Sequence, residues 1–323
     1  RYLHTPEFKE RVLSTVQEAT GSAVEVAEMD ISLLRGITLE GVVIADPSGL
    51  SDEFLAADRL ILHHQLLPLL SRQVQIHRLS LDRPVATMVQ GEDAAWNFEQ
   101  FFSTPSESGA KPVRAPEETS EGERAFDVNL SHLSISDAEI SMLNSEGGVM
   151  AQVHDLNLVS SGNFLEKRLN AVGNLTAKTV NLGGSLLLRD VSAPVLISPE
   201  ALKFSAVSGQ LAGGDLSGDI VFSSDPEFQY VLNLQLTGAD VNALLQEVKM
   251  GPEINGKLQA SVRMEGRGAF SSMVGQGQVS LVGGRVSHLP AQEFIASLLQ
   301  VPSLSEVNFE ECVVEFTLAG NIL

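Results

Sequence analysis

The clearest pattern in this chain of 323 residues is a strict alternation of apolar and polar residues from Ile254 to Glu265. Such a period of two is typical of a strand with one apolar and one polar face, because successive side chains of a strand point to opposite sides. A helix would scatter the same apolar positions around its whole circumference. The alternation recurs from Tyr230 to Leu236 and from Cys312 to Leu318. The pattern predicts a long antiparallel sheet, and the main question is what its apolar face covers.

The cleanest apolar positions of a single parity lie in the first two of these stretches. We expect neighbouring strands to align them into one continuous apolar stripe. The stripe is expected to be lined by Leu232, Leu234, Leu236, Ile254, Leu258, Val262 and Met264. Alternation alone does not distinguish an open groove from the closed core of a sandwich. A charge at Leu258 would reach water in an open groove, whereas burying it unpaired in a closed core would cost several kcal/mol.

Helix signals interrupt the strands at three places. Thr5 is suited to cap a helix that has proline at its first position, and Gly21 is suited to end it in a left-handed conformation. A second helix is expected to begin after the cap residue Asp240. A third is expected from about Ala291 to Gln300, before Pro302. The predicted fold class is therefore mainly β with a few helices (α+β), with an N-terminal helix and a long antiparallel sheet.

Changes of parity and paired glycines predict how the strands are joined. Ser22 to Ala45 is expected to form two strands, and a bulge is predicted where the apolar parity changes between Val26 and Met29. Paired glycines accept the positive φ angles of a tight hairpin turn. Four pairs are predicted as hairpin tips, at 147–148, 183–184, 213–214 and 283–284.

One segment differs in composition from the rest. Ser103 to Glu123 contains three prolines and many Ser, Gly and Glu residues, with almost no large apolar ones. Such a segment cannot bury enough apolar surface to offset the entropy lost on ordering, so we predict a flexible linker or loop. The domain boundary is placed here, with an N-terminal domain at 1–102, the linker at 103–125 and a C-terminal β region at 126–323.

Charge and composition exclude several classes of function. The formal net charge is -20, which disfavours nucleic acid, because binding to its phosphates requires a basic surface. The single cysteine, Cys312, excludes an intrachain disulfide and a thiolate metal cluster. Only 5% of the residues are aromatic, so aliphatic side chains carry most of the apolar surface, and carbohydrate binding is disfavoured.

The sequence contains no motif that indicates an enzyme. It lacks a nucleophile elbow, a zinc-protease motif, a C-x-x-C pair and a P-loop. The glycines around Gly266 and Gly275 lack the third glycine and the following helix of a dinucleotide-binding loop. His63 and His64 are adjacent, so on a strand they point to opposite faces and cannot jointly bind one metal. We expect no catalytic residue, no metal ligand and no cofactor.

The order of short motifs along the chain resembles that of the AsmA-like family of Gram-negative envelope proteins. The likeness covers both ends of the chain well and the middle, about 105–165, poorly. Its N-terminal motifs are Thr20-Gly21, Val24-Glu25-Val26, Ile31-Ser32-Leu33, Gly36-Ile37-Thr38-Leu39, Asp46-Pro47, Ala57-Asp58, Leu66 to Leu70, Ile76 to Leu81, Arg83-Pro84 and Trp96-Asn97-Phe98. Its C-terminal motifs are Thr237-Gly238-Ala239-Asp240-Val241, Ile254-Asn255-Gly256, Glu265-Gly266-Arg267-Gly268, Gly277-Gln278-Val279-Ser280 and Gly283-Gly284-Arg285-Val286.

The resemblance implies a periplasmic protein anchored in the inner membrane. It implies a sheet curled into an open hydrophobic β-groove, as in TamB-like and chorein-type bridge proteins. The implied role is to hold lipid acyl chains, for phospholipid transfer between inner and outer membrane or for outer-membrane assembly. The family places a transmembrane helix just before a segment like Arg1-Tyr2-Leu3, so we expect an apolar helix of about 20 residues upstream of Arg1. The implied partners are phospholipid or other acyl chains and the inner membrane.

Two alternatives stay open at this point. The apolar face could cover the ordinary closed core of a β-sandwich. The chain could also be a structural or interaction module of another kind, an adhesin or a scaffold.

Overall fold

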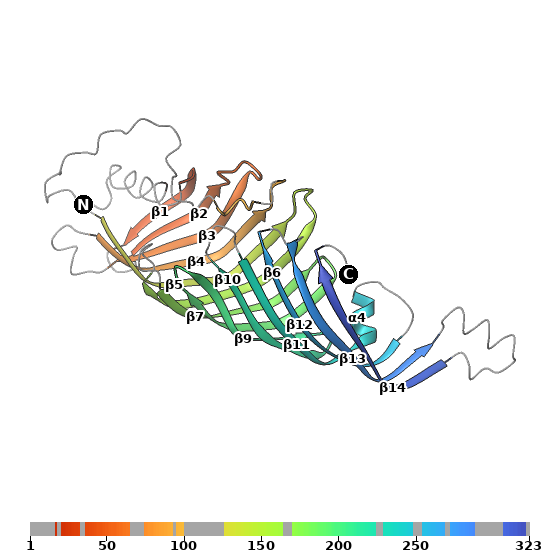
Figure 1. The fold of residues 1–323 in the computed structure, drawn as a ribbon. Coiled ribbons are helices and arrows are strands. Elements are labelled where there is room, and N and C mark those ends of the chain that lie inside the picture. The colour runs from red at the N-terminus through yellow and green to blue at the C-terminus, as the bar shows by residue number, and fades with distance from the viewer. Residues whose placement is uncertain are drawn as a thin grey trace. The chain divides into compact units, whose positions relative to one another are not determined.

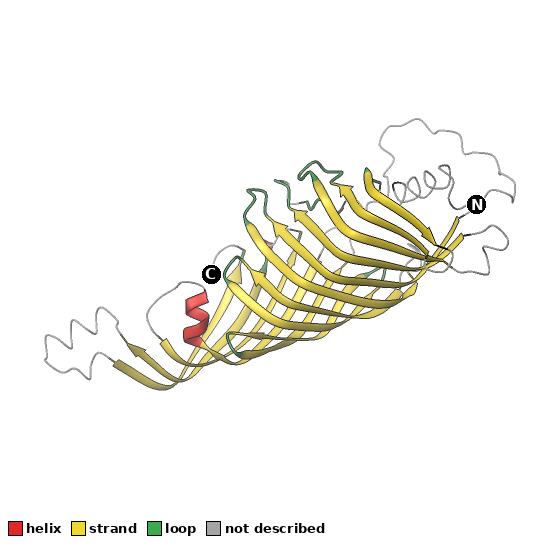
Figure 2. Cartoon of the chain, turned by 180° about the vertical axis from the view of Figure 1, so that it is seen from behind, coloured by secondary structure: helices red, strands yellow, loops and turns green. Residues whose placement is uncertain are grey.

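The computed structural model describes residues 17, 21–32, 36–64, 74–92, 95–99, 126–163, 170–223, 229–247, 254–268, 272–287 and 306–320. These residues form fourteen strands and one helix, so the protein is mainly β (Figures 1 and 2). The strands are hydrogen-bonded in chain order, from β1 to β14, in one mostly antiparallel sheet that does not close on itself. The two facing sheets of a sandwich are therefore not formed by the described strands.

Three predicted segments fall outside the described residues: most of Thr5 to Gly21, the helix at Ala291 to Gln300, and the linker at Ser103 to Glu123. At the end of the first, Gln17 is helical and its carbonyl accepts the N–H of Gly21 at 2.8 Å. Gly21 has a φ angle of 63°, as the predicted left-handed cap requires. The N-terminal helix itself stays a prediction.

The chain divides into two compact units, Arg1–Val149 with Leu156–Ala171, and Met150–Asp155 with Val172–Leu323. The strands of the first unit are β1 (Val24–Ser32), β2 (Gly36–Ala45), β3 (Glu53–His64), β4 (Val74–Val89) and β5 (Phe126–Leu143), with most of β6 (Val149–Asn163). The second contains most of β7 (Asn170–Leu182), and β8 (Leu186–Ile197), β9 (Ala201–Leu211), β10 (Gly214–Ser223), β11 (Gln229–Asp240), α4 (Val241–Glu247), β12 (Ile254–Arg267), β13 (Val274–Ser287) and β14 (Glu306–Ala319).

In the first unit one pair of neighbouring strands runs in parallel. β1 to β4 pair in antiparallel order, whereas β5 runs parallel to β4, with Val74 opposite Phe126 and Val89 opposite Leu143. Alternation predicts which face a residue occupies but carries no information on strand direction. The expected antiparallel sheet therefore has an exception at β4 and β5.

The core of the first unit lies on one face of β1 to β4. Its buried residues are Val24, Ile31, Ile37, Leu39, Val42, Ile44 and Leu60. Leu39 and Val42 have no exposed surface at all. Leu39 precedes Gly41 in the sequence and Val42 follows it. The φ angle of 60° at Gly41 reverses the side to which the following residues point, so both side chains enter the same core.

The same reversal occurs in the paired strand and explains the change of parity after Val26. Val26 pairs with Val42 and Met29 pairs with Leu39, with no shift of register between β1 and β2. Both strands therefore change parity at the same level, and both keep their apolar residues in the core. The predicted change of face is present, but it does not come from a bulge that shifts the pairing.

Left-handed residues also occur inside later strands, where polar side chains of the neighbouring strand contact them. Asp137, with φ 52°, donates its N–H to Asn157 Oδ1 at 3.1 Å. In the second unit, Ala206, with φ 48°, donates its N–H to Asp219 Oδ1 at 3.0 Å. A left-handed residue points its backbone N–H away from the carbonyl groups of the partner strand. In both cases a side-chain oxygen of the neighbouring strand accepts this N–H instead.

The predicted glycine turns are correct at three places and wrong at one. Gly147, Gly183 and Gly213 lie in turns between consecutive strands and have positive φ angles. Gly283 and Gly284, in contrast, lie within β13, which continues to Ser287. Gly283 has a φ angle of 61°. A Cβ atom on Gly284 would overlap the ring of its cross-strand partner Phe309, so this pair of glycines serves side-chain packing inside a strand.

A buried polar network in the first unit joins the turn after β2 to the segment after β4. Asp46 accepts hydrogen bonds from the backbone N–H and hydroxyl groups of both Ser48 and Ser51, at 2.6 to 3.0 Å. It also accepts one from Asn97 Nδ2 at 3.1 Å. Asn97 is fully buried, and its Oδ1 accepts the N–H of Val89 at 3.0 Å. The motifs Asp46-Pro47 and Trp96-Asn97-Phe98 therefore meet in space and have a structural role in this chain.

Candidate functional site

The strands β11 and β12 bring the predicted stripe residues together on one face. Leu232 lies opposite Met264, and Leu234 lies opposite Val262. Leu236 pairs with Ala260, and after a shift of register Leu258 pairs with Ala239. Ile254, the seventh predicted residue, packs against the same cluster as Leu236 and Leu258. The shared face of these residues agrees with the alternation that predicted it.

The register of β10, β13 and β14 extends this face into three rows of residues, each five strands wide. We call this surface the apolar face. The first row is Leu216, Leu236, Ala260, Val279 and Val314. The second row is Gly218, Leu234, Val262, Gly277 and Phe316. The third row is Ile220, Leu232, Met264, Gly275 and Leu318. The members of these rows from β10, β13 and β14 were not among the predicted site residues, because pairing register cannot be read from one strand's pattern.

Aromatic rings fill the space that glycines leave on their partner strands. Phe316 lies opposite Gly277, and a Cβ atom on Gly277 would be 2.5 Å from Phe316 Cζ. Tyr230 lies against Gly266 in the same way and is only 1% exposed. Burial raises the pKa of Tyr230, opposed by a hydrogen bond with Ser272. Glycine on one strand therefore gives an aromatic ring on the next strand room to lie flat on the sheet.

Helix α4 covers one end of the apolar face. Asp240 caps it as predicted, with its Oδ1 accepting the N–H of Ala243 at 3.0 Å. The buried cluster beneath and around α4 is Ala212, Leu216, Leu236, Ala239, Val241 and Leu258. Leu236 and Leu258 are 7% and 9% exposed there. At the other side of the first row, Val314 is 53% exposed, so the covering ends within the row.

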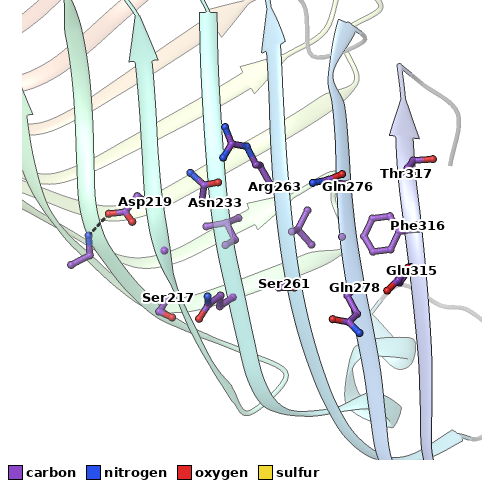
Figure 3. Close-up of a pocket in the computed structure, with 16 residues that line it drawn as sticks. Ser217, Asp219, Asn233, Ser261, Arg263, Gln276, Gln278, Glu315, Phe316 and Thr317 are labelled. Atoms are coloured by element: carbon purple, nitrogen blue, oxygen red, sulfur yellow. Dashed lines mark hydrogen bonds between the residues drawn. The ribbon is translucent and has the colours of Figure 1, made fainter.

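A depression of about 940 Å³ in the second unit is bordered by polar side chains (Figure 3). Two cross-strand ladders line it: Asp219, Asn233, Arg263, Gln276 and Thr317, and Ser217, Gln235, Ser261, Gln278 and Glu315. Of the seven predicted residues, only Leu234 and Val262 contribute to it. Because successive side chains alternate, those of Leu234 and Val262 point away from the ladders. This depression is therefore not the predicted apolar groove.

Within the described ranges, no group of three or more His, Cys, Asp or Glu residues is placed to hold a metal ion. The thiol of Cys312, at the edge strand β14, is exposed. The described residues include no helix with the length and apolar character needed to cross a membrane. What the site does provide is a wide aliphatic surface with a polar surface on its reverse side.

Comparison of the chain with models of protein families, with curated proteins and with solved structures found no match in any of the three.

Proposed function

We propose that this protein is a non-enzymatic envelope protein that holds phospholipid acyl chains along the apolar face, in a groove formed by curling of the sheet. Its role would be phospholipid transfer between the inner and outer membranes, or outer-membrane assembly. The single observation that carries the proposal is that the apolar face is continuous over five strands yet only part-buried beyond α4. Val262 and Met264 are half-buried, and Val314 is exposed.

The free energy of transfer supports an acyl chain as the occupant. Each methylene group that leaves a membrane for water costs about 0.8 kcal/mol, so a transferred lipid needs an apolar surface along its whole tail. The five strands of each row, at about 4.8 Å spacing, span roughly 19 Å. Half the thickness of a bilayer's hydrocarbon core is about 15 Å. The apolar face is therefore wide enough to hold an acyl chain.

The periplasmic location and the inner-membrane anchor rest on the resemblance to the AsmA-like family. The motif order that carries it includes Asp46-Pro47 and Trp96-Asn97-Phe98, which come together in one buried network. The hydrogen bond between Asn97 and Asp46 makes both motifs part of one structural contact. It supports the resemblance without bearing on the ligand.

The experiment that tests the proposal combines native mass spectrometry of detergent-free protein with uptake of a fluorescent phospholipid. The variant Val262→Asp places a charge on the apolar face, whereas Ser261→Asp places the same charge one residue away on the polar face. We expect co-purified phospholipid in the unmodified protein and in Ser261→Asp, and its loss in a folded Val262→Asp variant. Equal lipid uptake by the two folded variants would contradict the proposed site. Absence of lipid from all three proteins would favour the scaffold or adhesin alternative.

A further inference from the structure

Helix α4 occupies part of the surface that an acyl chain would use. Its residues Val241, Leu244 and Leu245 belong to or pack against the cluster of Leu236 and Leu258. Figures 1 and 2 show the helix beside the C-terminal strands. The third row contributes no residue to this cluster among the described ones. The helix thus takes the place of a ligand over one end of the apolar face and leaves the other end uncovered.

A polar contact fastens the far end of α4 to another strand. The carboxylate of Glu247 accepts the N–H of Leu187 at 3.4 Å, and Arg189 Nη1 lies 3.6 Å from Glu247 Oε1. Both Leu187 and Arg189 belong to β8, so the helix bridges from the β11–β12 side to β8. The Arg189 side chain is 47% exposed, and a contact open to water to this degree holds weakly.

The length of α4 makes its position dependent on these contacts. It has seven residues, about two turns, and a helix this short is not stable by itself in water. Gly238, three residues before the helix, has a φ angle of 74° at the point where the register of β11 and β12 shifts. The helix is therefore held by its apolar contacts and by Glu247.

We propose that α4 is an internal stop that limits how far an acyl chain extends along the strands from the third row towards the first, and so sets the chain length that the protein binds. This inference rests on the proposed function. Along the uncovered part of the face, each added methylene gains about 0.8 kcal/mol, which is roughly a fourfold increase in affinity. Once the tail reaches α4, further methylenes find the surface occupied by Leu244 and Leu245 and gain nothing.

The test uses lysophosphatidylethanolamines of increasing acyl-chain length, below their micelle concentrations, competing with a fluorescent phospholipid. Glu247→Ala removes the contact with β8, and Gln246→Ala, at an exposed neighbouring position of α4, is the matched control. In the unmodified protein and the control, affinity is expected to rise about fourfold per methylene and then level off. In Glu247→Ala the rise is expected to continue to longer chains.

Hydrogen exchange of the α4 amides shows whether the helix has been loosened. If Glu247→Ala leaves exchange unchanged, the double variant Leu244→Ala with Leu245→Ala removes the apolar contacts instead, and circular dichroism checks that the sheet is retained. A loosened helix with an unmoved plateau, or no plateau in the unmodified protein, overturns the stop. If ligand binds only when α4 is loosened, the result supports the stop in a stronger form, in which α4 blocks binding of the acyl chain altogether. Absence of binding by every protein overturns the proposed function and, with it, the stop.

Discussion

The side-chain amide of Asn97 donates a hydrogen bond of 3.1 Å to the carboxylate of Asp46, which lies 51 positions earlier in the chain. Both side chains are buried, and Asn97 also donates to the carbonyl of Thr87 at 3.0 Å. The contact joins the turn after β2 to the segment after β4. Because both partners are buried, loss of this contact has a predictable cost.

Replacing Asn97 by Ala is expected to lower the free energy of unfolding by about 2–4 kcal/mol, because it leaves Asp46, the N–H of Val89 and the carbonyl of Thr87 each without one buried partner. Urea denaturation followed by circular dichroism measures this. The control is Asn233→Ala, at an exposed position of β11, where a change within about 0.5 kcal/mol is expected. Equal midpoints for the two variants would show that the buried network contributes nothing to stability.

Acid is expected to destabilise the first unit through Asp46. Burial by itself raises the pKa of this carboxyl, but hydrogen bonds from Ser48, Asn97 and Ser51 together lower it below the ordinary value of 3.8. Because the folded-state pKa is the lower one, the stabilisation is fully present above the unfolded-state pKa and is lost as pH falls through the folded-state value. Unfolding midpoints measured from pH 6 down to pH 3 should therefore fall more steeply in the unmodified protein than in Asp46→Asn. Parallel curves for the two proteins would exclude Asp46 as the titrating group.

Gly277 is expected to tolerate no side chain while Phe316 lies over it. Gly277→Ala would place a Cβ atom 2.5 Å from Phe316 Cζ and 2.8 Å from the carbonyl oxygen of Ser261. Overpacking of this kind costs typically about 1–3 kcal/mol. Adding Phe316→Leu should recover part of the loss, since it removes the ring but not the backbone contact. If the double variant loses at least as much unfolding free energy as the two single variants lose together, the ring is not the source of the strain.

The structure changes which substitution distinguishes an open apolar face from a closed core. Leu258 is 9% exposed beneath α4, so Leu258→Asp is expected to cost several kcal/mol whether the rest of the face is open or not. Val262 is half-buried in the second row, and a charge there can reach water. Thermal unfolding should show a large loss of stability for Leu258→Asp and a small one for Val262→Asp. Similar large losses in both would indicate that the second row is covered as well.

The alternations from Tyr230 to Leu236 and from Ile254 to Glu265 predicted two strands, the two faces of each, and which face of its strand each of the seven candidate residues occupies. Asp240 likewise predicted the start of α4, because a capping side chain is a local signal. What could not be predicted depends on which strands are neighbours. The parallel partner of β4, the packing of α4 over Leu258 and the ring of Phe309 against Gly284 all join residues distant in sequence, about which a pattern within one strand carries no information.

The parallel pairing of β4 with β5 also sets a minimum length for the chain between them. Val74 pairs with Phe126 and Val89 with Leu143, so after Val89 the chain has to return along the whole 16-residue strand, about 50 Å, before Phe126. Positions 90 to 125 supply 36 residues for this return, and the first ten include Gln90 and Asn97, which bond back to β4 and β5. Removing 103–123 would leave 15 residues, fewer than the path requires once those bonds are kept. Deletions at this place are therefore limited by distance, and a shortened chain would have to give up either the Asn97 contacts or the pairing of β4 with β5.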